Sequence, residues 1–222
     1  FGGMFAQSNK LTWMLMLPYL SYDMAVKAKM GGAISTMTST GIGDVKFGAL
    51  YSFLNNESSK VHFNLIGSLP TGAIDVKSGN MTVGYPMQLG SGSVDLRPSF
   101  TIIRFYDKAS FGSQFNIVYR TEDNNQNYRL GHFFNHKVWF AKSFGNYSLS
   151  TSLIYETSSV ISGNHSGIMT VMNASQDASN SGSEQLSSSI GLNIVYKNGF
   201  RFAAEYLMPI YQNVTGYQMN CV

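Results

Sequence analysis

The feature that most constrains this chain is an alternation of short and long breaks between segments whose residues alternate apolar and polar. Short breaks rich in Asn, Ser, Gly, Lys and Asp fall at 7–10, 55–60, 107–110, 145–146 and 198–199. The breaks between them are mostly long and rich in Gly, Ser, Thr and Asn, at 29–41, 73–91, 122–127 and 162–183. Outer-membrane barrels combine tight periplasmic turns with longer outer loops, whereas a soluble β-sandwich has no reason to sort its loops by length. The rhythm therefore predicts an all-β fold, a transmembrane antiparallel β-barrel.

The period-two segments divide the chain into about ten strands of a single domain, 1–222. We expect them at about 1–6, 10–28, 42–54, 60–72, 92–106, 111–121, 128–144, 147–161, 185–197 and 200–213. In most of them apolar residues form one face and polar residues the other, as a strand between lipid and a watery lumen requires. The facing of 128–143 stays open, because His132 and His136 are in phase with Phe134 and Phe140.

The polar faces of these strands supply the predicted inner wall. A charge on the lipid face near mid-bilayer costs about 2–4 kcal/mol, so charged residues should point inward or lie near a rim. Arg97, Arg201 and Glu205 are expected to form an ion-pair network in the lumen. The residues predicted to line the lumen are Asp44, Lys46, Asn64, Asp95, Arg97, Gln114, Asn116, Arg120, Glu156, Asn193, Arg201 and Glu205.

Composition excludes several other classes. Charged residues make up 12% of the chain, about half the usual share for a soluble globular domain. The longest purely apolar run, 13–17, is far shorter than the roughly 20 residues of a spanning helix. A net charge of +3 without a basic cluster argues against nucleic acid as a partner. Cys221 is the single cysteine, so we expect no intramolecular disulfide and no multi-cysteine metal site, and we expect no cofactor.

Aromatic residues gather near the short breaks, as in the girdle that outer-membrane barrels place at a membrane interface. The alternative is that aromatics simply favour strands. The residues concerned are Tyr51, Phe53, Phe63, Phe105, Tyr106, Phe111, Phe144, Tyr147, Tyr196 and Phe200.

Two of the long breaks carry different expectations. The segment 85–92, which begins with Tyr85, Pro86, Met87 and Gln88, is predicted to be an ordered loop that folds back onto the barrel mouth. The segment 162–183 is low in complexity, and we expect it to be mobile.

The sequence does not predict an enzyme. A barrel phospholipase would need Ser, His and an orienting Asn within reach on the outer face. His132 and Asn135 point to opposite faces of one strand, and His136 has no obvious serine partner. The two histidines lie roughly 13 Å apart by the strand rise, too far to share a metal.

Several stretches then resemble one family. They are Gly41–Tyr51, His62–Asp75, Tyr85–Gly92 with its Tyr-Pro-Met-Gln-Leu-Gly-Ser-Gly run, Tyr128–Gly131 and Glu205–Gln212. Together they resemble the bacterial outer-membrane barrels of the transporter and meta-pathway of phenol degradation family, over nearly the whole chain. The resemblance implies a channel in the Gram-negative outer membrane, with poorly defined substrates and twelve strands.

Three functional hypotheses follow. The first is a porin-like channel or transporter for small solutes, with apolar or aromatic ones as candidates, surrounded by membrane lipid. The second is a structural or accessory barrel that binds partner proteins in a larger outer-membrane complex. The third is a conduit for soft metals such as Cu(I), because thioethers select such ions. The methionines in the long breaks are Met30, Met37, Met81, Met87, Met169, Met172 and Met219.

The ends of the chain give a final expectation. The first strand, 1–6, is shorter than the roughly nine to eleven residues of a spanning strand. Because an unpaired strand edge is not tolerated in lipid, we expect an open seam between 1–6 and 200–213 that awaits one further strand at each end.

Overall fold

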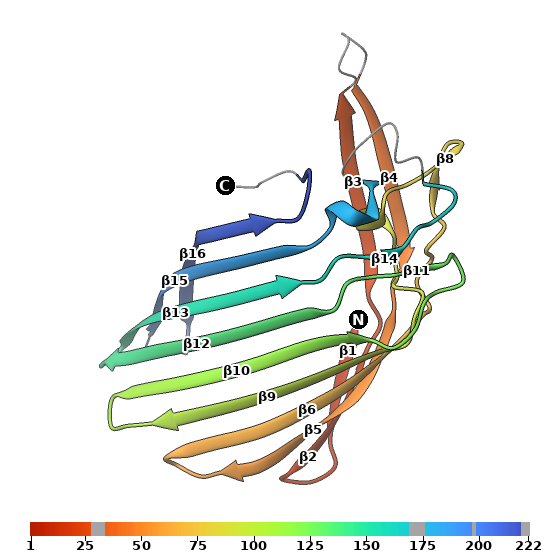
Figure 1. Ribbon diagram of the computed structural model, residues 1–222. Helices are drawn as coiled ribbons and strands as arrows, with labels where there is room; N and C mark the ends of the chain where they lie inside the picture. The colour runs from red at the N-terminus through yellow and green to blue at the C-terminus, as the bar shows by residue number, and fades with distance from the viewer. Residues whose placement is uncertain (28–33, 169–175, 197–198, 219–222) are drawn as a thin grey trace.

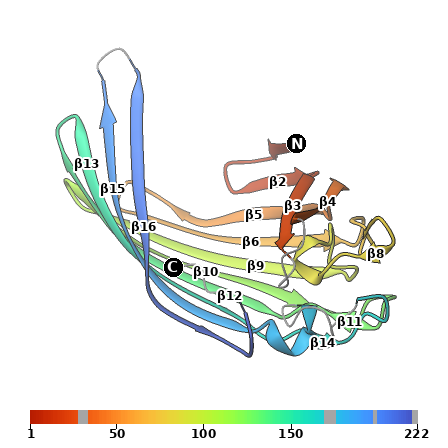
Figure 2. The ribbon, with the colours of Figure 1, turned by 90° about the horizontal axis from the view of Figure 1, so that it is seen from above.

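The computed structural model describes residues 1–27, 34–168, 176–196 and 199–218. Ten strands form one antiparallel sheet that curves into a trough (Figures 1 and 2). In their order across the sheet they are β1 (Gly2–Ala6), β2 (Leu11–Met16), β5 (Val45–Asn55), β6 (Ser59–Leu69), β9 (Asp95–Phe105), β10 (Ala109–Arg120), β12 (Phe133–Phe144), β13 (Tyr147–Ser158), β15 (Ser183–Val195) and β16 (Arg201–Val214). The all-β class and the large antiparallel sheet are confirmed.

The sheet does not close upon itself. β1 and β16 are its two edges, and no ladder joins them within the described residues. The expected open seam between the first and last strands is therefore observed, and a closed barrel is not. No helix in the described ranges has the length and apolar character needed to cross a membrane.

Three small two-stranded sheets and two short helices complete the described structure. They lie mainly at the end of the trough where the long connections gather (Figure 2). The elements are β3 (Tyr19–Lys27) with β4 (Ile34–Ile42), β7 (Lys77–Ser78) with β8 (Met81–Thr82), β11 (Tyr128–Arg129) with β14 (Ser162–Gly163), and the 3₁₀ helices η1 (Tyr85–Met87) and η4 (Ala178–Asn180). We call this the loop end, and the opposite end, with its tight hairpins, the turn end.

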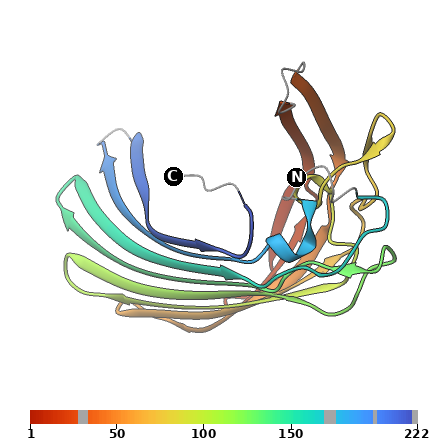
Figure 3. The same cartoon turned by 45° about the horizontal axis from the view of Figure 1, so that its top comes forward.

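The expected strand 10–28 is wrong as a single element. It is interrupted between Met16, where β2 ends, and Tyr19, where β3 begins, because Pro18 has no N–H to donate to a ladder. The second half, β3, pairs with β4 in a hairpin that rises away from the main sheet (Figures 1 and 3). β4 occupies much of the expected loop 29–41, of which 29–33 lie outside the described residues.

The turn end is built from tight reversals. Gly145 adopts a positive φ of 67° between β12 and β13, as the first central residue of a two-residue hairpin turn requires. Phe144 and Tyr147 flank this turn and stack with ring centroids 5.4 Å apart. Near the turn between β5 and β6, the rings of Tyr51 and Phe53 meet edge to face, with centroids 5.0 Å apart.

Burial divides the molecule into two regions of opposite polarity. Of the nine buried apolar side chains in the described ranges, eight lie at the loop end, and the ninth is Val118 in β10. Five of the eight form one cluster, composed of Ile74, Tyr85, Tyr128, Ile168 and Ala178. Within the ten-stranded sheet the buried side chains are mostly polar, and large apolar side chains are exposed.

Candidate functional site

The polar residues of the sheet share its concave face. Residues paired across an antiparallel ladder point to the same side. Lys46 pairs with Ser68, Ser68 with Asp95, and Asp95 with Arg120. Continued across the sheet, this register places eleven of the twelve predicted wall residues on one face, and Asp44 lies just before β5. That this face lines a lumen stays a prediction.

The middle of the concave face carries amide and hydroxyl hydrogen bonds from strand to strand. Gln114 donates to Thr101 at 3.1 Å. Asn116 donates to Asn135 at 3.0 Å, and Asn135 donates to Glu156, also at 3.0 Å. Gln114, Asn116 and Asn135 thus each donate to a partner on the neighbouring strand, as half-buried polar groups require.

Near the loop end the concave face holds a buried ion pair. Arg120 pairs with Asp95, whose side chain is fully buried and also accepts a hydrogen bond from Ser93 Oγ at 2.9 Å. Asp44 accepts hydrogen bonds from the backbone N–H of Gly72 and from both the N–H and the hydroxyl of Ser91. These two carboxylates therefore attach the loop between β6 and β9 to the sheet.

A second polar group lies around a cavity of about 400 Å³ between β12, β13, β15 and β16. Lys137 Nζ and Glu205 Oε1 are 3.7 Å apart, and Ser189 donates to the same carboxylate oxygen at 2.6 Å. Trp139 lies over Gly112, where an added Cβ would come within 2.1 Å of the indole ring. The cavity therefore has one aromatic wall among polar ones.

The expected network of Arg97, Arg201 and Glu205 is not formed among the described residues. Glu205 contacts Lys137, and Arg201 Nε donates to Asn193 at 2.5 Å. Arg97 belongs to β9, five strands away from β16 in the sheet order. Lys137 was missed because the facing of its strand had been left open; the register places it on the concave face, with His136 on the convex one.

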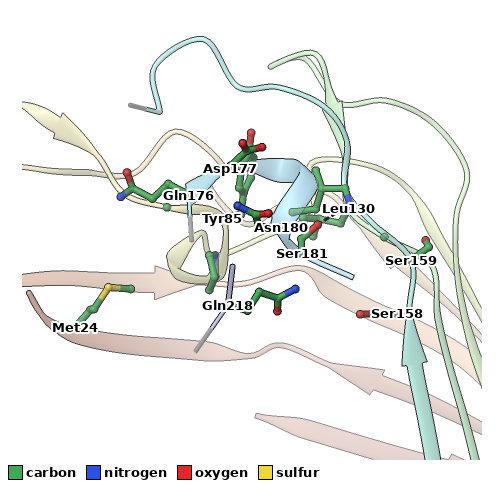
Figure 4. A pocket seen from close by; sticks show the side chains of 14 residues that line it. Met24, Tyr85, Leu130, Ser158, Ser159, Gln176, Asp177, Asn180, Ser181 and Gln218 are labelled. Carbon is green, nitrogen blue, oxygen red and sulfur yellow. Dashed lines mark hydrogen bonds between the residues drawn. The ribbon is translucent and has the colours of Figure 1, made fainter. Parts of the chain in front are cut away.

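The loop end contains a separate cavity of about 460 Å³ (Figure 4). Its walls come from the β3–β4 hairpin, η1, the residues just before β12, the end of β13 and the residues that follow it, η4 and the residues after β16. We call it the loop-end pocket. Its lining is Met24, Gly84, Tyr85, Pro86, Leu130, Gly131, Ser158, Ser159, Ile161, Gln176, Asp177, Asn180, Ser181 and Gln218.

Tyr85 connects this pocket to the apolar cluster beneath it. Its ring meets Tyr128 edge to face, with centroids 4.9 Å apart, and its hydroxyl accepts a hydrogen bond from the backbone N–H of His165 at 3.0 Å. Burial raises the pKa of Tyr128 to about 12. Across the pocket, hydrogen bonds from the hydroxyl and backbone N–H of Ser179 lower the pKa of Asp177, whose side chain caps η4. The pocket therefore combines an apolar floor with a polar, acidic rim.

The segment 85–92 packs into the loop end. Tyr85, Met87 and Gln88 are buried, and Pro86 is exposed. Gln88 donates to the carbonyl of Val83 at 2.8 Å and accepts from the N–H of Val76 at 3.1 Å. That this segment lies at a barrel mouth stays a prediction.

The mobility expected for 162–183 concerns in part residues 169–175, which lie outside the described residues. On either side, the chain forms β14 and η4, and His165 contacts Tyr85 and Tyr128. These contacts were not foreseen from the low sequence complexity.

Two histidines have well-defined partners on the convex side. His136 Nε2 lies 3.0 Å from the hydroxyl of Ser113, so the expectation that it lacks a serine partner is wrong. Its ring also stacks on Phe115, with centroids 4.0 Å apart. His132 accepts a hydrogen bond from the N–H of Arg120 and stacks on Tyr119. Ser113 was missed because its partner strand had no assigned facing.

The methionines of the soft-metal hypothesis lie only partly within the described residues, where Met37 pairs with Met24 across the β3–β4 ladder. Met30, Met169, Met172 and Met219 lie outside the described residues, as does Cys221. Met87 is buried in the loop end, and Met81 is exposed. Over the described ranges, no three or more His, Cys, Asp or Glu side chains form a group that could hold a metal. A soft-metal conduit stays a prediction.

Comparison with known protein families identifies a match. A family model described as "Putative MetA-pathway of phenol degradation" matches residues 5–208, from β1 into β16. No curated protein matches this chain.

Proposed function

The chain belongs to the family described as putative MetA-pathway of phenol degradation, and from that premise we propose that it forms an outer-membrane β-barrel channel for small apolar or aromatic solutes. The proposed role is passive and involves no catalysis. The family description supports a link to phenol degradation, and the resemblance found in the sequence supports the membrane location.

The inverted polarity of the sheet is the observation that carries the proposal. Large apolar side chains on the convex face are exposed: 52% for Phe47, 47% for Leu153 and 67% for Ile190. Away from the strand ends, the concave face carries the charged and amide side chains instead. Proteins surrounded by water rarely expose such a continuous apolar surface. Lipid outside and water inside would satisfy both faces.

The two cavities support the choice of solute. The loop-end pocket offers Tyr85, Pro86, Leu130 and Ile161 to an apolar body, beneath a rim of polar groups. The cavity beside Lys137 has Trp139 among polar partners. A small aromatic solute with one polar group could use both kinds of surface.

The proposal requires that the two edge strands of the sheet be paired in the membrane. Unpaired backbone groups at a strand edge are not tolerated in lipid, so the gap between β1 and β16 must be closed in the membrane. Heat-modifiable migration on denaturing gels, a property of intact barrels, would report that closure.

The deciding experiment reconstitutes the full chain in liposomes and planar bilayers. We expect ionic conductance together with faster phenol entry than in protein-free liposomes. Leu130→Asn, which makes the loop-end pocket more polar, should slow phenol entry, whereas Glu57→Gln in a turn-end hairpin should not. A well-inserted protein that gives neither conductance nor phenol entry would overturn the channel.

An accessory role in a larger outer-membrane complex is the second candidate. The β3–β4 hairpin supports it, because it projects from the sheet (Figure 3) and its Tyr22 is exposed. Co-purification of a defined partner that is lost when residues 21–40 are replaced by a short Gly-Ser turn would favour this role.

A further inference from the structure

Five charged side chains lie together on the concave face toward the loop end, and they do not balance. The cations are Lys46, Arg97 and Arg120, and the anions are Asp44 and Asp95. Arg120 pairs with Asp95, and Asp44 is occupied by backbone and hydroxyl donors. Lys46 and Arg97 have no ion pair within the described part of the chain. One positive charge is therefore left over.

The register brings these two cations to either side of one strand. On β6, Ser68 pairs with Lys46 and Ile66 with Arg97. Ile66 also pairs with Gly48, and because glycine has no side chain, this position places nothing between Lys46 and Arg97. Arg97 Nε is buried and has no hydrogen-bond partner among the described residues. A buried guanidinium nitrogen without an acceptor is costly, and an incoming anion would satisfy it.

An apolar wall adjoins Lys46, and one member of it, Ile66, pairs with Arg97 across the ladder. A cavity of about 300 Å³ is lined by Lys46 together with Met4, Met14, Met16 and Ile66, all of which share the concave face. Thioether side chains are flexible and make favourable contacts with aromatic rings. Charge on one side and an adaptable apolar wall on the other suit a ligand that has both characters.

We propose that Lys46 and Arg97 bind the carboxylate of a small organic acid, whose ring or chain packs against Met4, Met14, Met16 and Ile66. Arg97 would supply planar, charge-assisted hydrogen bonds and Lys46 a mobile point charge. The inference rests on the proposed channel and specifies its substrate class, an amphipathic monocarboxylate.

The test measures binding to the full chain in detergent by titration calorimetry. The probes are benzoate, benzyl alcohol, acetate and inorganic phosphate, which separate the ring from the charge and a carboxylate from a free inorganic anion. We expect benzoate to bind tighter than the other three. Lys46→Gln and Arg97→Gln should each weaken benzoate about tenfold, the loss of one hydrogen bond to a charged group, without changing benzyl alcohol.

Lys60→Gln is the matched control, because Lys60 lies at the turn end of β6, over the Phe105 ring and outside the three cavities. It should leave benzoate binding unchanged, and Lys46→Arg should retain it. If Arg97→Gln does not fold, benzoate binding by Lys46→Gln, at a half-buried position, decides the test. Benzoate no tighter than benzyl alcohol, phosphate as tight as benzoate, or equal losses in all Gln variants would each overturn the site.

Phenol entry into liposomes separates the two proposals. Phenol entry with no benzoate preference would leave the channel standing without this site. Benzoate binding that needs Lys46 and Arg97, in a protein that admits no solute, would support the site and contradict the channel.

Discussion

The ten-stranded sheet and the loop end follow opposite rules of burial. At the loop end, Ile74, Tyr85 and Tyr128 are buried together, and polar groups buried beside them, such as Gln88 and Asn124, are hydrogen-bonded. In the sheet, Asp95, Thr101 and Ser189 are buried, and Phe47 and Leu153 are exposed. The same chain thus forms a conventional apolar core at one end and the reverse arrangement along the wall.

This difference indicates two surroundings. A buried apolar cluster is the response of a chain to water, because apolar area removed from water stabilises the fold. The exposed apolar side of the wall gains nothing from water but is well suited to hydrocarbon. Under the proposed function, the loop end projects into water and the wall lies in lipid, so substitutions should act differently in the two regions.

The largest effect is expected where the regions meet. Asp95→Asn leaves Arg120 buried without its anion, and breaking such a pair costs about 3–5 kcal/mol of unfolding free energy. The control is Asp123→Asn, because Asp123 and Arg129 form an exposed pair 3.5 Å apart, worth at most about 1 kcal/mol. Urea unfolding in lipid vesicles measures both. Similar losses would mean that the Asp95 pair is open to water.

A charge on the wall tests the polarity of the sheet most directly. Ile117→Lys on the convex face should destabilise the inserted protein by about 2–4 kcal/mol if that face lies in lipid. Its neighbour Asn116 points to the concave face, so Asn116→Lys should cost much less. Comparable costs, measured in the same vesicles, would contradict the assignment of the two faces.

A smaller change compares packing in the two regions. Ile74→Val removes one methylene from the loop-end cluster and should cost about 0.5–1.5 kcal/mol. Ile102→Val makes the same change on the convex face, where lipid chains would fill the space, and should cost less. Equal costs for the two variants would indicate that the convex face at Ile102 is covered by protein.

The smallest effect at neutral pH is expected at Tyr128. Its hydroxyl is buried and has no hydrogen-bond partner in the described ranges, so Tyr128→Phe should be neutral or stabilise by about 1 kcal/mol. Destabilisation by more than this would reveal a partner for the hydroxyl.

The pH dependence of the same residue has a definite sign. An unfolded tyrosine loses its proton near pH 10, whereas folded Tyr128 keeps it until about pH 12. The folded state then holds the extra proton, so its stability is complete below pH 10 and declines as pH rises toward 12. Tyrosinate absorbance should follow the titration, and proteolysis of the loops should follow the decline in stability of the wild type. The part of the decline that is due to Tyr128 should be absent in Tyr128→Phe.

Much of the wall could be predicted because strands have a period of two. Alternation within one strand fixes which residues share a face, and Lys46, Asn64 and Glu156 fall on one face without any knowledge of their partners. Contacts across many strands are not encoded in this way. Arg97 and Glu205 therefore looked like partners, although five strand positions separate them.

The missed elements had weaker signals. β4 contains Thr36, Thr38 and Thr40, and β-branched residues favour strands, yet the Ser and Gly around them suggested a loop. The loop-end pocket unites residues from Met24 to Gln218, and no local pattern indicates which of the long connections meet. Such assemblies depend on tertiary packing.

The order of strands in the sheet also bears on how the protein assembles. Apart from the inserted small sheets, each strand pairs with the next one along the chain, so every ladder can form as a local hairpin. Local pairing keeps the entropy cost of closing each loop low and favours rapid folding. The tight hairpins β5–β6, β9–β10, β12–β13 and β15–β16 can therefore register early, while the long connections from β2 to β5, from β6 to β9 and from β13 to β15 delay their assembly into one sheet. A folding intermediate in which separate hairpins have formed is the expected consequence.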